Sequence, residues 1–167
     1  SIPLNKELIF IGVSFGGILA QEISKIIPVK KIILISTIKS AAEKPKYFSW
    51  VQMFPVYKII PTILIKYLAI FISKFFTNKN NEERQLFKSM LMQANSRVIR
   101  YGIHEVLHWK QQHPIANCIH IHGSADHIFP IKKIKTDYVI DSGSHFMIIH
   151  QRKEINALIN QLLGKII

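Results

Sequence analysis

The sequence has little cysteine and little acidic charge. Its single cysteine, Cys118, excludes an internal disulfide and is typical of a reducing compartment, so we expect a cytoplasmic protein. The chain has 10 Asp and Glu against 22 Lys and Arg, which gives a net charge of +12. Such an excess can serve an anionic partner. The lysines are spread along every segment, however, without aromatic interleaving or a nucleic-acid motif, so nucleic-acid binding is not favoured.

The chain also lacks an initiator methionine, a visible signal peptide and a long uninterrupted apolar run. It begins at Ser1 and enters an apolar stretch almost at once, so we expect a fragment whose earlier part is missing. Residues 59–76 come nearest to a membrane helix, but Lys66 lies mid-span. Because a charge at the bilayer centre costs about 3 kcal/mol, the pattern favours an amphipathic helix with a wide apolar face. Attachment to a membrane surface stays open without being favoured.

Apolar residues are plentiful enough for one folded domain. They make up 49% of the 167 residues, with 19% charged, which excludes a disordered chain. Two apolar runs, residues 8–13 and 32–36, are separated by an amphipathic stretch at helical spacing. A strand, a helix and a strand over about thirty residues predict a βαβ unit, and hence a parallel sheet.

Residues 40–116 contain no strand-like run. Prolines and a polar tract divide this segment into amphipathic stretches. The predicted helices cover residues 50–57, 62–76, 82–94 and 96–110.

Strand patterns return after this helical segment. They cover residues 117–123 and 137–140, and an amphipathic helix pattern over 145–163 follows them. The chain is therefore predicted to have an α/β core made of residues 1–39 and 117–167, into which residues 40–116 are inserted.

Residues 8–17 carry the most informative pattern, an apolar run that ends in Gly-x-Ser-x-Gly and continues as a helix. This is the context of a nucleophile elbow, a sharp turn that presents one hydroxyl at the carboxyl end of a strand. We expect Gly12 and Gly16 to be required because a side chain at either position would collide with neighbouring backbone. The amide of Phe15 would point to where an oxyanion forms. Ser14 is the candidate nucleophile; the alternative is an ordinary glycine-bearing turn.

A serine hydroxyl becomes a good nucleophile when a histidine takes its proton and an acid orients that histidine. Asp126 follows the strand at 117–123, within His-Gly-x-x-Asp-x-x-x-Pro, and His145 precedes the last helix, within Gly-x-His-Phe. Carboxyl ends of parallel strands share one edge of the sheet, so Ser14, Asp126 and His145 can meet there. Asp141 is a weaker rival acid because it lies just before the histidine loop.

The order Ser, Asp, His and the three motifs around them resemble the α/β-hydrolase fold superfamily, most of all its small, lid-bearing bacterial serine hydrolases. The resemblance covers the chain from Leu8 onward. It implies the carboxyl half of a mostly parallel sheet, with residues 40–116 where the family inserts a helical cap. The roles that it implies by position are Ser14 as nucleophile, His145 as general base, Asp126 as orienting acid and the N–H of Phe15 as an oxyanion donor.

The resemblance implies acyl transfer on a carboxylic ester or thioester, without a cofactor or a metal ion. Large apolar residues in the cap predict an apolar group in this small-molecule substrate. Two features depart from the family pattern. The loop that supplies the second oxyanion donor in the family follows an earlier strand, which this sequence does not contain. The interval between Asp126 and His145 is also short.

Two other functions stay open. One is a non-enzymatic interaction module that keeps the fold. The other is a zinc protease, because His104-Glu105-x-x-His108 on a helix would place two histidines on one face. A third zinc ligand is hard to find, since His113 does not fit the longer zinc motif and Glu154 follows two further predicted strands. An ordinary cap helix is the favoured interpretation of this segment.

Overall fold

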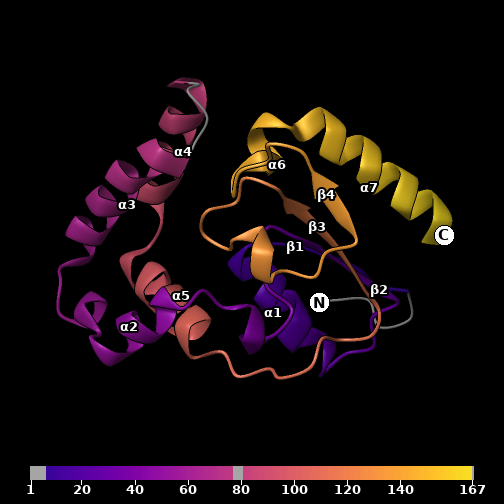
Figure 1. Ribbon diagram of the computed structural model, residues 1–167, viewed down its shortest axis with the longest axis horizontal. Coiled ribbons are helices and arrows are strands. Elements are labelled where there is room, and N and C mark those ends of the chain that lie inside the picture. Colours follow the sequence, from indigo (N-terminus) through magenta and orange to yellow (C-terminus); the bar gives the residue numbers. More distant parts are fainter. Residues whose placement is uncertain (1–6, 77–80, 167) are drawn as a thin grey trace.

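The computed structural model describes residues 7–76 and 81–166 (Figure 1). The start of the chain, on which the expectation of a missing earlier part rests, lies outside these residues. Within them, four strands form one parallel sheet in the order β1-β2-β3-β4. The strands are β1 (Ile9–Val13), β2 (Lys31–Ile35), β3 (Cys118–Gly123) and β4 (Tyr138–Ile140). This sheet and its helices confirm the α/β class predicted from the βαβ pattern.

Helices cover both faces of the sheet, because strand β2 is apolar on both sides. Ile33 and Ile35 pack into a cluster with residues of β3, β4, α6 and α7. Ile32 and Leu34, which alternate with them, pack with residues of α1 on the opposite face. Figure 1 accordingly shows α7 and α1 on different sides of the strands. These helices are α1 (Phe15–Ser24), α6 (Met147–His150) and α7 (Arg152–Ile166).

The segment between β2 and β3, residues 40–116, is mainly helical in its described part, as predicted, and we call it the helical insertion. Its helices lie together beside the sheet (Figure 1, left). A buried cluster joins Phe48, Leu107 and Trp109 of the insertion to Ile18 and Phe129 of the core. The insertion's longer helices are α2 (Tyr47–Met53), α3 (Thr62–Phe76), α4 (Asn81–Gln93) and α5 (Ser96–His108), and its 3₁₀ turns are η1 (Ala41–Glu43) and η2 (Val56–Lys58).

Two predicted helices differ from those in the structure. The helix expected over 50–57 is instead α2, which ends at Met53 ahead of Pro55, followed by the separate turn η2. The last helix is interrupted at Gln151, whose side chain donates to the Asp141 carbonyl at 2.9 Å. Both differences come from tertiary contacts or a proline, which helical periodicity alone does not show.

Candidate active site

Ser14 lies in the turn between β1 and α1. Its backbone φ of 51° falls in the left-handed region, which costs a residue other than glycine about 1–2 kcal/mol. Two hydrogen bonds hold this turn: Ser14 N–H donates to the Ile35 carbonyl at 2.9 Å, and the Thr37 hydroxyl donates to the Ser14 carbonyl at 2.7 Å. The strained turn places the half-buried Ser14 side chain at the carboxyl edge of the sheet.

Close backbone approach explains one of the two glycines that flank Ser14. A Cβ added at Gly12 would lie 2.6 Å from the Gly16 carbonyl oxygen, so no side chain fits there. At Gly16 an added Cβ meets nothing within 4 Å, and the expectation that this glycine is sterically required is therefore wrong. The constraint falls on Gly17 instead, where a Cβ would lie 2.6 Å from a Thr37 methyl group.

Asp126 and His145 are carried by two loops that lie back to back, after β3 and β4. A Cβ added at Gly123, the last residue of β3, would lie 2.1 Å from the Gly143 carbonyl oxygen. That carbonyl accepts a hydrogen bond from Ala125 N–H at 2.9 Å. Contact between the two backbones therefore holds the loops of the carboxylate and the imidazole together.

Ser14, His145 and Asp126 form one chain of hydrogen bonds. The Ser14 hydroxyl donates to His145 Nε2 at 2.8 Å, and His145 Nδ1–H donates to Asp126 Oδ2 at 2.9 Å. Asp126 is 3% exposed and His145 5% exposed, whereas the serine stays accessible. The rival acid Asp141 is exposed and contacts the Ser124 hydroxyl at 3.4 Å. The geometry suits proton transfer from the serine to the ring while the acid holds the ring in place.

The Asp126 carboxylate has hydrogen-bond partners on both oxygens. Its Oδ1 accepts the N–H groups of Ile128 at 2.8 Å and Phe129 at 2.9 Å. Burial raises the pKa of Asp126, but the hydrogen bond and charge of His145 and the N–H of Phe129 together lower that pKa more, to below its usual value. Asp126 is therefore ionised at neutral pH, as a partner for a protonated imidazole must be.

A second histidine, His122, lies behind Asp126. Its Nε2–H donates to the Phe129 carbonyl at 2.8 Å and lies 3.5 Å from Asp126 Oδ2. The next histidine along β3, His120, has its ring 5.2 Å from that of His122. Burial lowers the pKa of both rings, that of His120 to about 3, so both are neutral. The sequence motifs did not mark these two histidines as part of the site, although residues two apart on a strand share a face.

The helical insertion reaches the core on both sides of this hydrogen-bonded chain. On one side, Gly102 of α5 faces the ring of Phe15, the residue after Ser14. A Cβ added at Gly102 would be in van der Waals contact with that ring, at 3.5 Å. On the other side, the ring of Phe87 of α4 lies 4.6 Å from that of Phe146, next to His145. These contacts could not be predicted from sequence patterns, because they involve segments whose patterns are those of ordinary amphipathic helices.

The histidines of His104-Glu105-x-x-His108 make other contacts. His104 Nδ1 and the Tyr57 hydroxyl share a hydrogen bond of 2.8 Å, and His108 Nδ1–H donates to the His104 carbonyl at 2.9 Å. Over residues 7–76 and 81–166, no three His, Cys, Asp or Glu side chains lie close enough together to hold a metal ion. The geometry therefore gives the zinc hypothesis no third ligand within this part of the chain.

None of the helices in the described part of the chain is both long and apolar enough to cross a bilayer.

Known proteins resemble this chain in structure. The sequence matches no family model and no curated protein. An esterase from Thermogutta terrifontis superposes with a TM-score of 0.73 at 16% identity, over 98% of this chain and 66% of its own. An esterase from Exiguobacterium antarcticum superposes with a TM-score of 0.66 at 15% identity, over 93% of this chain and 65% of the esterase. A bromoperoxidase from Bacillus anthracis superposes with a TM-score of 0.67 at 15% identity, over 95% of this chain and 68% of the bromoperoxidase.

These likenesses show that the chain has the α/β-hydrolase fold, as the sequence motifs predicted. The chain spans about 66% of the length of the Thermogutta terrifontis esterase.

Proposed function

We propose that this protein is a serine hydrolase that cleaves a carboxylic ester or thioester by acyl transfer through Ser14. The observation that carries the proposal is the chain of hydrogen bonds from Ser14 through His145 to Asp126, at 2.8 and 2.9 Å. Serine is a weak nucleophile on its own, and a buried imidazole held by a carboxylate is the arrangement that activates it. The esterases among the structural neighbours support the same reaction class.

The first half of the proposed reaction forms an acyl-serine. Ser14 Oγ attacks the carbonyl carbon as its proton passes to His145 Nε2, and the ionised Asp126 stabilises the resulting imidazolium. The N–H of Phe15 stands at the first position of α1, where the helix offers it no carbonyl partner, and it can stabilise the oxyanion. The imidazolium then returns its proton to the departing alcohol or thiol.

The second half releases the acid. His145 takes a proton from a water molecule, which attacks the acyl carbon, and the proton then passes to Ser14 Oγ as the acyl–serine bond breaks. Every proton is exchanged among the substrate, water and these side chains, so the mechanism needs no cofactor.

We further propose that the helical insertion acts as a cap, or lid, over the core made of residues 1–39 and 117–167. Its contacts beside Ser14 and His145, through Gly102 and Phe87, support this role. Exposed apolar side chains on the insertion could line a space for an apolar acyl or alcohol group. Rates on esters of rising chain length, from acetate upward, test this: rates should rise with length, and a flat or falling series would argue against an apolar pocket.

A fluorophosphonate probe, which reacts with activated serines, tests the proposed reaction. The parent protein should be labelled at Ser14, and S14A should not be labelled at all. Asp126→Asn should slow ester hydrolysis by about 10⁴-fold, because the amide favours the wrong imidazole tautomer. A folded parent protein that resists the probe would instead favour an interaction module with this fold.

A further inference from the structure

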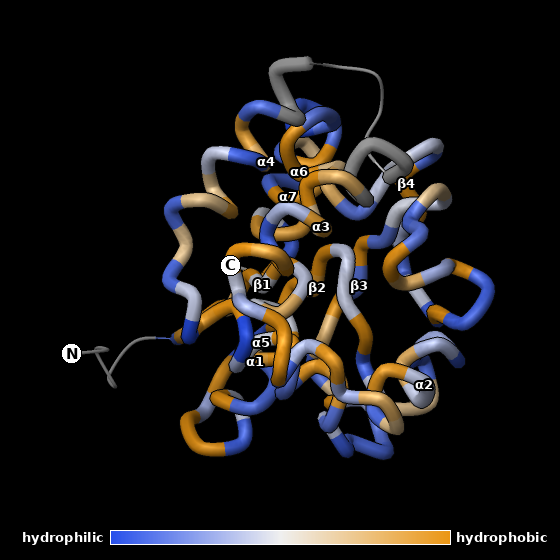
Figure 2. Tube along the Cα trace, turned by 90° about the vertical axis from the view of Figure 1, so that its left-hand side faces the viewer, coloured by the Kyte–Doolittle hydropathy of each residue, from blue (hydrophilic) through white to orange (hydrophobic). Residues whose placement is uncertain are grey.

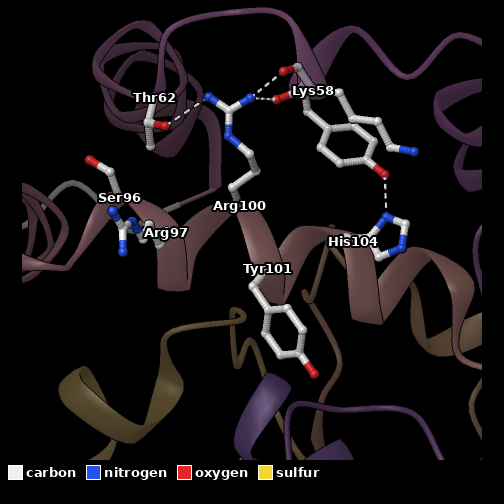
Figure 3. Close-up of a pocket in the computed structure, with 8 residues that line it drawn as sticks. Lys58, Thr62, Ser96, Arg97, Arg100, Tyr101 and His104 are labelled. Carbon is white, nitrogen blue, oxygen red and sulfur yellow. Dashed lines mark hydrogen bonds between the residues drawn. The ribbon is translucent and has the colours of Figure 1, made fainter.

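A cavity of about 540 Å³ lies within the helical insertion, between η2, the start of α3 and one side of α5. Residues of the proposed serine site do not line it. Figure 3 labels seven of its lining side chains. The full lining is Tyr57, Lys58, Thr62, Ser96, Arg97, Arg100, Tyr101 and His104. We propose that this cavity binds a small organic anion, in which a carboxylate or phosphate group is attached to an apolar body.

The lining of the cavity is positively charged and, within the described part of the chain, has no acidic partners. The lining includes Lys58, Arg97 and Arg100, and it includes no aspartate or glutamate. Across the described residues, none of these three cations has a carboxylate within 4.0 Å. Three like charges around one cavity repel one another, and an anion between them would relieve that repulsion.

Arg100 fixes the shape of the cavity. Its guanidinium donates to the carbonyls of Tyr57 and Ile60, both at 2.9 Å, to the Lys58 carbonyl, and to the Thr62 hydroxyl at 3.0 Å (Figure 3). These bonds hold η2 and the start of α3 against α5. Because they use its terminal N–H groups, Arg100 contributes its charge to the cavity but leaves the direct contacts to other residues.

Lys58 and Arg97 are free to make those contacts. Both side chains are exposed, and within the described part of the chain no hydrogen bond engages either cationic group. Ser96 adds a hydroxyl beside them. A guanidinium, an ammonium and a hydroxyl around one cavity suit the oxygens of a carboxylate or a phosphate.

Aromatic rings supply the apolar part of the cavity. Tyr57 lines the cavity with its largely buried side chain, whose hydroxyl shares a hydrogen bond with His104. Tyr101 leaves α5 on the side opposite Arg100 (Figure 3). It is next in sequence to Gly102, which faces the Phe15 ring. A ligand held here would therefore contact the helix that packs beside Ser14.

Calorimetric titration with phenyl phosphate tests the proposal, with phenol as the neutral match. The protein is the full chain carrying S14A, so that binding is measured independently of hydrolysis. Phenyl phosphate should bind, and Lys58→Gln with Arg97→Gln should weaken its binding about tenfold or more, because two charged contacts are lost. Lys46→Gln with Lys110→Gln removes equal charge from exposed positions outside the cavity and should leave binding unchanged.

Three results would overturn the proposal. They are equal binding of phenyl phosphate by the parent and the cavity variant, equal binding of phenol and phenyl phosphate, and an equal loss of affinity in the control variant. Each is read from binding alone, so each can be told apart from a failure of the proposed hydrolase.

A kinetic measurement with Ser14 intact separates the two possible sources of the anion. If the anion is part of the ester substrate, the cavity variant should raise KM for para-nitrophenyl succinate and not for the neutral para-nitrophenyl butyrate. If the anion is a separate ligand, KM should stay unchanged for both esters while phenyl phosphate binding is still lost. Either result supports an anion site.

Discussion

The core and the helical insertion differ in what they do with their apolar residues. In the core, Ile33, Leu34 and Ile35 of β2 are fully buried. In the insertion, Trp50 is 65% exposed and Ile59 is 85% exposed. Figure 2 shows hydrophobic segments both in the central strands and in the helices around them. Hydrophobicity of the sequence is therefore similar in the two regions, whereas burial is not.

Polar anchors replace part of the missing apolar burial in the insertion. Lys44 Nζ donates to the carbonyls of Leu107, in the last turn of α5, at 2.6 Å and of Trp109, just past its end, at 2.5 Å. Trp109 Nε1–H donates to Glu22 of α1 at 2.7 Å. Hydrogen bonds of this kind are directional, so they fix where a helix lies without requiring a large apolar interface. The core is therefore organised mainly by apolar packing, whereas the insertion combines one buried cluster with a small number of specific hydrogen bonds.

Two isoleucines give the sharpest test of this difference. Ile35→Ala in the core should lower the free energy of unfolding by about 2–5 kcal/mol, because it leaves a cavity in a fully buried cluster. Ile59→Ala in the insertion should change it by less than about 0.5 kcal/mol, since that side chain is 85% exposed. Urea denaturation measures both. Equal effects would mean that the exposed face of the insertion is covered in solution.

Lys66 tests the importance of the polar anchors. This residue is 6% exposed, and its ammonium donates to the carbonyls of Met92 at 3.0 Å and Ala94 at 2.7 Å, at the end of α4. Lys66→Met keeps most of the side-chain volume and leaves those carbonyls unpaired, which should cost about 1–3 kcal/mol.

Hydrogen exchange measures which elements lose stability in Lys66→Met. Amides of α3 and α4 should exchange faster in Lys66→Met, while those of β2 and β3 keep their protection. Lys58→Met is the matched control, because that lysine is exposed and its ammonium holds no carbonyl. Uniform loss of protection through the sheet would contradict the division between a packed core and an anchored insertion.

Acid should affect the core through His120. The unfolded chain binds a proton near pH 6.5, while burial lowers the folded pKa of His120 to about 3. Between these values the unfolded state binds more protons, so stability falls as the pH falls, by up to about 1.4 kcal/mol per pH unit. Denaturation at pH values of about 7 and 5 should show this slope. His120→Leu should reduce it, and the exposed His113→Leu of the insertion should not.

The sequence predicted the features that depend on local patterns. Strand β2 could be predicted because a strand buried on both faces is a continuous apolar run. The proximity of Ser14, Asp126 and His145 could be predicted because each follows a strand at the same edge of the sheet. Features that depend on contacts between distant segments could not be found. The requirement for glycine at position 17 depends on Thr37, and the bonds of Arg100 join α5 to a turn some forty residues earlier.

The contact between Gly123 and Gly143 has a consequence for how this protein can evolve or be redesigned. Both glycines belong to the core, and their close backbone contact holds together the loops that carry Asp126 and His145. Under the proposed cap role, substitutions at exposed positions of residues 40–116 would alter ligand preference while this backbone contact between the two loops stays in place. A library that randomises exposed positions of the insertion and leaves these two glycines untouched would test new ligands for the proposed hydrolase while the contact between the acid and base loops is kept.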